Sequence, residues 1–375
     1  MCGRAVGIIF ICMIANAAIA GPYTESGING YIDTATWRHA NPQDSGTILN
    51  PIFRAWATGW LEYSPSDTVW FGAGVWNDPN KSLGPVTGQN YDIVSLGELT
   101  DAEIEQGAPP GHITLVFGDR YDGSDEDVIR NGAGYDFVVF ENAMIAAQPK
   151  PNVGIIAGQI SAELGYVEVS SNGRDFARFP CVSLTPTRVG PYGTIEISNI
   201  HNLAGKHPNA NGICMGTPFD LTDIANHPSV KAGLVDLDNI RYVRIVDVPG
   251  SGDFFDEAVA YIDPDTMPVW SNYSANHAIY DFWPTRGSGG FDLEAIGVLN
   301  EQQYPADINL DGIVDMFDLA ILASAWQVHF GQPDWFGRCD LAQPNDLLVN
   351  GLDFAVLASQ WRCVERWRAE FLDEK

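Results

Sequence analysis

Short apolar runs bounded by turn residues dominate the chain between residues 21 and 304. They are rich in valine, isoleucine, phenylalanine and tyrosine, which favour β-strands. The clearest runs cover residues 112–117, 136–140, 166–170, 194–198 and 242–246. No helical pattern alternates with them, so a parallel sheet with crossover helices is not indicated. We therefore predict a mainly β domain over residues 21–302, an antiparallel β-sandwich of jelly-roll type.

One β-hairpin is predicted from local turn chemistry. Asn172 and Gly173 separate the run 166–170 from the run 175–179. An Asn-Gly pair between two strand-like runs is typical of a tight hairpin turn, because both residues tolerate a positive φ angle.

The pattern changes to a helical period near the C-terminus. Leu319, Leu322, Ala323 and Trp326 lie at the spacing of one helix face. The segment 318–326 recurs at 353–361, with Asp, Ala, Leu, Ala, Ser and Trp matching. Such a repeat indicates two copies of one loop–helix unit, each too small to bury its apolar face alone. We expect the two helices to share a core formed by Leu322, Trp326, Leu357 and Trp361.

The loop before the first helix has the ligand spacing of a twelve-residue calcium loop. Gly312 stands at the sixth position, where such a loop turns sharply. Calcium prefers six to eight oxygen ligands, which side chains at alternating positions supply. The candidate ligands are Asp307, Asn309, Asp311, the backbone carbonyl of Ile313, Asp315 and Asp318.

The second loop departs from this spacing. Leu347 replaces the turn glycine, and Asp340 lies two residues too far upstream, which indicates a two-residue insertion. An acidic turn without metal is the alternative for both loops, and a stronger alternative for the second. The candidate ligands here are Asp340, Asp346, Leu348, Asn350 and Asp353.

Residues 306–362 resemble a type I dockerin domain, the duplicated calcium-loop module of secreted polysaccharide-degrading systems. The resemblance implies a calcium-binding domain over residues 303–375, after a linker at 300–305, and a cohesin-like scaffold as partner. Many dockerins recognise cohesin through a Ser/Thr-type pair at loop positions ten and eleven. This chain has Met316-Phe317 and Gly351-Leu352 there, so a different cell-surface scaffold is the alternative partner.

The large domain resembles a family of bacterial secreted or cell-surface proteins from planctomycetes and similar bacteria, for which no activity is established. The resemblance therefore implies a compartment and no reaction. It is carried by the segments 53–56, 95–97, 109–115, 135–142, 204–207, 216–220 and 287–297.

The N-terminus and the charge limit the compartment and the partners. Residues 1–20 have the lone cation Arg4, an apolar run and a small-residue site at 18–20, the pattern of a secretory signal peptide. We expect a secreted or cell-surface protein without a transmembrane anchor, because no later run is long enough to span a bilayer. A formal net charge of −28 argues against nucleic acid as a partner.

Four cysteines remain after the expected signal peptide. In an oxidising compartment, Cys339 could pair with Cys363 and Cys181 with Cys214. Free buried thiols are the alternative.

Carboxylates at the ends of the predicted strands suggest further chemistry in the large domain. They could hold a structural calcium ion, or they could only satisfy backbone groups in turns. A pair of carboxylates among Glu98, Glu141 and Glu294 could also serve a glycoside hydrolase. The strand-end set is Asp136, Glu141, Asn142, Asp247, Asp281, Asp292 and Glu294.

We predict a secreted calcium-binding protein with a non-catalytic binding or attachment role. No nucleophile elbow, phosphate loop or zinc motif appears in a fitting context. The alternative is a polysaccharide-degrading hydrolase targeted by its dockerin-like module. A polysaccharide is a candidate partner in both cases, because tryptophan and tyrosine rings can stack on sugar rings; packing in the core or at its rim is the more common role of such rings in a β-sandwich.

Overall fold

The structure is a computed structural model of the whole chain. It describes residues 21–66, 76–118, 127–191, 193–261, 275–285, 289–329, 332, 334–343 and 346–373. The expected signal peptide, residues 1–20, lies outside these ranges. Within the described ranges, no helix combines the length and apolar character that a membrane span requires.

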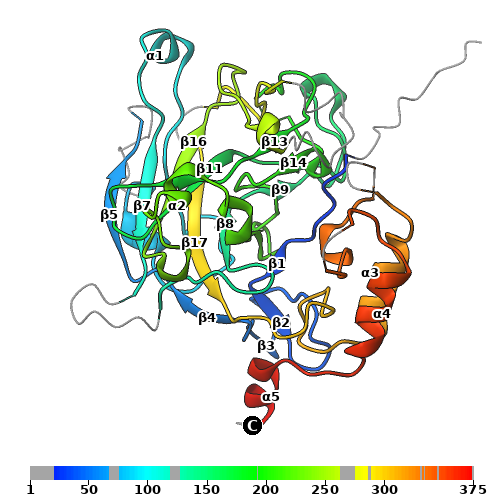
Figure 1. Cartoon of the computed structure of the whole chain (residues 1–375). Helices are drawn as coiled ribbons and strands as arrows, with labels where there is room; N and C mark the ends of the chain where they lie inside the picture. The colour runs from blue at the N-terminus through cyan, green and yellow to red at the C-terminus, as the bar shows by residue number, and fades with distance from the viewer. Residues whose placement is uncertain are drawn as a thin grey trace, which may run out of the picture.

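Two antiparallel sheets form the large domain, as the mainly β prediction requires (Figure 1). The six-stranded sheet has the order β1 (Ile28–Asn29), β15 (Met215–Phe219), β8 (Phe137–Glu141), β17 (Asp292–Leu299) and β4 (Phe53–Trp56), and β6 (Val94–Ser95) also pairs with β17. The five-stranded sheet has the order β12 (Ala177–Arg178), β11 (Leu164–Ser170), β16 (Tyr242–Val248), β7 (His112–Val116) and β5 (Gly59–Ser64).

The other elements are short. Three small ladders join β2 (Tyr31–Asp33) to β3 (Thr47–Leu49), β9 (Met144–Ile145) to β10 (Ile160–Ser161), and β13 (Val182–Ser183) to β14 (Ile200–His201). The α-helices are α1 (Asp101–Glu105), α2 (Pro228–Lys231), α3 (Met316–Ser324), α4 (Gly351–Ser359) and α5 (Arg366–Asp373). The 3₁₀ turns are η2 (Pro79–Ser82), η3 (Pro151–Val153), η4 (Ile197–Asn199), η5 (Leu221–Ile224), η6 (Leu237–Asn239), η7 (Ala258–Tyr261) and η9 (Gly337–Cys339).

Four of the five predicted strand runs are confirmed as β7, β8, β11 and β16, and the Asn-Gly turn joins β11 to β12. The strand predicted at 194–198 is wrong. There Ile195 makes one isolated bridge with Ile160, and η4 begins at Ile197. The Glu196 side chain accepts a hydrogen bond from the Ser198 amide, and such a local contact competes with a sheet ladder.

The largest core cluster lies between the two sheets. Phe137 and Val139 of the six-stranded sheet and Val167 and Ile245 of the five-stranded sheet are all fully buried in it. The Phe137 ring stacks on Phe219 with centroids 5.3 Å apart. Contact between the inner faces is what holds the two sheets together, since apolar burial is the main favourable term in folding.

The six-stranded sheet is buried on its outer face as well. Every residue of β8 and β17 is buried. A second cluster covers the outer face, and it includes Phe140 from β8 together with Leu310 and Trp367 from the C-terminal region. The C-terminal helices therefore lie against the large domain, beside β1, β2 and β3 (Figure 1).

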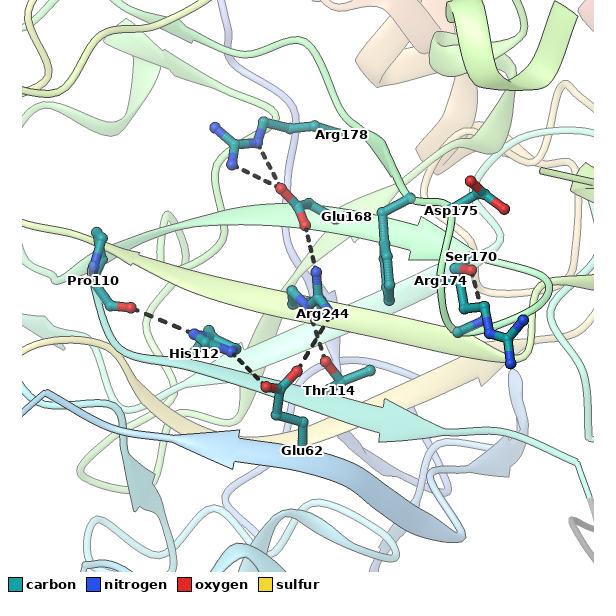
Figure 2. A network of polar contacts seen from close by, with 12 residues as sticks. Glu62, Pro110, His112, Thr114, Glu168, Ser170, Arg174, Asp175, Arg178 and Arg244 are labelled. Atoms are coloured by element: carbon teal, nitrogen blue, oxygen red, sulfur yellow. Dashed lines mark hydrogen bonds and ion pairs between the residues drawn. The ribbon is translucent and has the colours of Figure 1, made fainter. Parts of the chain in front are cut away.

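The outer face of the five-stranded sheet is polar instead. Arg244 on β16 lies 3.5 Å from carboxylate oxygens of both Glu62 and Glu168, and Arg178 donates two hydrogen bonds to Glu168 (Figure 2). Charges of opposite sign on neighbouring strands stabilise such a ladder.

The expected linker at 300–305 is held at both ends. The amide of Asn300 donates to the Ile52 carbonyl, and the amides of Gln303 and Tyr304 donate to the Glu365 carboxylate. The C-terminal region is therefore joined to the large domain by an ordered segment.

Of the two alternatives for the cysteines, the structure shows free thiols: within the described ranges Cys181, Cys214, Cys339 and Cys363 form no disulfide. Cys181 and Cys214 belong to different core clusters. Cys339 is fully buried in the C-terminal cluster, and Cys363 packs against that cluster.

Replacing Phe137 tests the inter-sheet core. The Phe137→Ala change removes a fully buried ring and should lower the free energy of unfolding by about 3–5 kcal/mol. Tyr91→Ala is the control, because Tyr91 is 71% exposed, and it should change stability by less than about 0.5 kcal/mol. Urea unfolding measures both, and equal effects would contradict the core assignment.

Candidate calcium-binding module

The two predicted loops each lead directly into a helix. Asp315 caps α3 and Asn350 caps α4, and both helices begin with a capping box. In each box the third helical residue, Asp318 or Asp353, accepts a hydrogen bond from the amide of the capping residue. The last position of each loop is thus fixed by the start of its helix.

The final aspartate of each loop holds the same set of backbone amides. One Asp318 oxygen accepts from the amides of Ile308 and Asn309 at 2.7 and 3.1 Å. The equivalent Asp353 oxygen accepts from Leu341 and Ala342 at 2.7 and 2.8 Å. The sequence repeat is therefore also a repeat in three dimensions.

The two-residue insertion lies between Asp340 and Leu347. In the first loop, Asp307 accepts from the amide of Gly312, five residues on, at 2.9 Å. In the second, Asp340 accepts from Leu347, seven residues on, at 3.0 Å. Gly312 and Leu347 have φ angles of 85° and 60°. Leu347 thus adopts the left-handed turn that glycine makes at lower energetic cost.

Each loop is joined to the segment that follows the other helix. Ile313 forms an antiparallel bridge with Val364, and Leu348 forms one with His329. Val314 donates to the Cys363 carbonyl at 3.0 Å, and Val349 donates to Val328 at 3.1 Å. The two units therefore exchange equivalent contacts and form one module.

The module core differs from the prediction in one respect. Leu322 and Leu357 are buried as expected, but Trp326 and Trp361 are 44% and 38% exposed. Both tryptophans lie just beyond the ends of α3 and α4. The prediction assumed that the helical period continues to these positions, but the backbone is no longer helical there. Trp335 and Phe336, from the segment between the units, are the large aromatic residues buried in this core.

The first loop concentrates negative charge in a buried place. Asp307 and Asp318 are 1% and 0% exposed. Burial, followed by the charges of Asp318 and Asp311, raises the pKa of Asp307 well above its ordinary value. Burial likewise raises the pKa of Asp318 to about 6 and that of Asp340 in the second loop to about 6.

These residues fit calcium by donor chemistry, because all the side-chain ligands are oxygens. As they stand, the described His, Cys, Asp and Glu side chains include no group of three or more that could hold a metal ion. Their oxygens accept hydrogen bonds from the loop backbone, as Asp311 does from Ile313 and Asp315 does from Phe317. In the second loop, the Asn350 amide group donates to the exposed Asp346.

An arginine that the sequence pattern does not predict contacts the first loop. Arg368 on α5 lies 3.0 Å from the Asp311 carboxylate and 4.1 Å from the centre of the Trp37 ring. It connects the fifth loop position to the large domain. Only the fold could place it there, since 57 residues separate it from Asp311.

The strand-end carboxylates of the large domain fall into two kinds. Asp136 and Glu294 organise loops: Asp136 accepts from the amides of Gly132 and Leu221, and Glu294 accepts from Thr87 and Gly88. The remaining acidic residues gather at one end of the two sheets. Glu98, Glu141 and Glu294, the candidate hydrolase carboxylates, are all buried, at most 4% exposed.

Gly312 offers a test of the loop geometry. In Gly312→Ala the new methyl carbon would lie 2.7 Å from Arg368 Cδ at a φ of 85°, so the free energy of unfolding should fall by about 2–4 kcal/mol. Gly351→Ala is the control, because nothing lies within 4 Å of its methyl position, and it should stabilise by about 0.4–1 kcal/mol. Urea unfolding of the full chain compares them. Equal effects would contradict the turn.

The raised pKa of Asp318 predicts how stability depends on pH. The folded chain holds the Asp318 proton more tightly than the unfolded chain. The stabilisation that this proton gives to the folded state is therefore present near pH 4 and is lost as the pH rises through about 6. With chelator, we expect the urea midpoint to be lower at pH 7 than at pH 4.5. With calcium the loss should shrink, because carboxylates bind calcium when deprotonated. A midpoint in chelator that rises across this window would count against the assignment.

Comparison with known proteins gives no match to the chain among protein-family models, curated proteins or solved structures. The function is therefore inferred from the geometry of the module and of the large domain.

Proposed function

We propose that the chain is a secreted or cell-surface calcium-binding protein with a non-catalytic binding or attachment role. Its large domain is a jelly-roll-type sandwich, and its C-terminal module is dockerin-like. The observation that carries the proposal is the pair of equivalent loops, in which Asp318 and Asp353 bind matching backbone amides ahead of matching helices. Loops of this design present several oxygens to one cation.

Calcium would relieve the charge crowding of the first loop. Asp307 and Asp318 are buried, and burial of an ionised carboxylate is unfavourable without a partner charge. Arg368 pairs with Asp311 on one side, which leaves Asp307 and Asp318 as the carboxylates that a cation would neutralise. The second loop has its turn at a strained leucine and an exposed Asp346, so we propose a weaker site there.

The exposed side of the module suits a protein partner. Met316 and Leu352, at loop positions ten and eleven, are 63% and 60% exposed, and Trp326 and Trp361 are also exposed. Exposed apolar residues of this kind favour protein contacts. Phe317 is 49% exposed, and Arg38 of the large domain lies 4.4 Å from its ring centre, so it borders both the module and the large domain. We propose a cohesin-like or other cell-surface scaffold protein as the partner.

Substitution of Asp318 tests the calcium site. The full chain should melt at a higher temperature in calcium than in chelator, and Asp318→Ala should remove most of that difference because the carboxylate both binds the ion and holds the loop. Asp373→Ala, which changes an exposed acidic residue of the same module, should retain it. An undiminished calcium effect in Asp318→Ala would refute the first-loop site.

Attachment is tested separately from calcium binding. Leu352→Glu should keep the calcium-dependent melting shift and lose calcium-dependent retention on the envelope fraction of the producing cells. Release of reducing sugar from plant or algal polysaccharides, abolished by one carboxylate substitution, would refute the non-catalytic assignment.

A further inference from the structure

Three carboxylates from both sheets lie at one end of the large domain, close enough to repel one another. Glu141 is the last residue of β8 and Asp292 is the first residue of β17, in the six-stranded sheet. Glu141 pairs with Leu293, so Asp292 lies one residue from it across the ladder. Glu163 directly precedes β11 of the five-stranded sheet. The three residues are 2%, 5% and 5% exposed, respectively.

Two of these carboxylates have a buried oxygen without a hydrogen-bond partner. Those oxygens are Glu141 Oε2 and Asp292 Oδ1. A methyl carbon built on Gly205 would lie 3.4 Å from Glu141 Oε2 and 2.1 Å from the Glu163 carbonyl oxygen. The unpartnered Glu141 oxygen and the backbone carbonyl of Glu163 therefore border the same point beside Gly205. Buried polar atoms in folded proteins are almost always satisfied, so each such oxygen requires an explanation.

The protein uses the other oxygens of the group. Asp292 Oδ2 accepts from the Asn142 amide group at 3.1 Å. Glu163 Oε1 accepts from the Gly290 amide at 2.9 Å and from the Thr285 hydroxyl at 3.0 Å. These bonds hold Asp292 Oδ2 and Glu163 Oε1 and leave Asp292 Oδ1 for a ligand.

The charge of the group is uncompensated within the described part of the chain. None of the ion pairs found there joins a lysine, arginine or histidine to Glu141, Glu163 or Asp292. Two further buried acidic residues add to the repulsion, and Asp247 Oδ2 and Asp281 Oδ1 also have no hydrogen-bond partner. Buried carboxylates in proteins are paired, protonated or bound to metal.

We propose that Glu141, Glu163 and Asp292 bind a calcium ion between the ends of the two sheets. The side chains are oxygen donors only, which suits a hard cation that accepts both one and two oxygens of a carboxylate. In the described arrangement they do not yet form a coordination sphere. The unpartnered oxygens, Glu141 Oε2 and Asp292 Oδ1, are the atoms that the ion would bind.

Such an ion would act as a cross-link. It would join β8 and β17 to the start of β11, in a domain whose cysteines are free. Because the ligands are at most 5% exposed, the ion would enter during folding and leave slowly. This site is independent of the C-terminal loops and would persist if those loops bound no metal.

The test uses the full chain with both C-terminal loops disabled by Asp318→Ala and Asp353→Ala. Purified from medium with millimolar calcium and dialysed, this chain should retain about one calcium per molecule by elemental analysis. Adding Glu141→Gln and Asp292→Asn should abolish the bound calcium. Adding Glu294→Gln instead should preserve it, because Glu294 lies on the same strand and is equally buried but bonds only to Thr87, Gly88 and Asn209.

A second measurement keeps the acidic residues of the large domain intact. The loop-disabled chain should unfold roughly tenfold more slowly in calcium than in chelator, since a ligand bound to the folded state stabilises it. No bound calcium together with identical unfolding rates would overturn the proposal and leave these carboxyls protonated. Equal calcium content in the wild-type and loop-disabled chains would refute the C-terminal site instead.

Discussion

Burial of the central strands β8 and β17 on both faces is the constraint on which the rest of the structure depends. Antiparallel sheets commonly leave one face in water, but every residue of these two strands is buried. One face packs on the five-stranded sheet, and the other requires a second cover. The N-terminal segment and the C-terminal module supply that cover through Trp37, Leu310 and Trp367. The module is therefore a layer of the fold as well as a candidate binding unit.

Two arginines connect the first calcium loop to the large domain. Arg338 donates to the carbonyls of Asp307 and Ile308 and faces the Tyr135 ring of the large domain. Arg368 pairs with Asp311 and lies over Trp37. The first loop is thus held between cations that also contact the large domain. The second loop carries an insertion and an exposed Asp346, and its contacts are chiefly within the module.

The sequence predicted what depends on local spacing. The loop order, the helix starts and the β11–β12 turn follow from side chains that bond backbone groups a few residues away. Packing between segments that are distant in the chain could not be predicted from the sequence. Trp326 and Trp361 have the helical spacing of core residues in the sequence, but they lie past the helix ends and are exposed. The approach of Glu163 to Glu141 and Asp292 depends on the packing of the two sheets against each other, and no spacing in one sequence encodes that convergence.

The Glu365 carboxylate has a mechanical consequence. It accepts hydrogen bonds from the amides of Gln303 and Tyr304, while the Gln360 side chain accepts one from the amide of Ala306. The segment that connects the large domain to the module is therefore hydrogen-bonded to the module itself. If the chain were fixed to a surface through this module, the large domain would not rotate freely about a flexible linker. It would stand at a set angle, presenting the same side of its sheets outward, and a pull on the module would load β17 directly through Asn300.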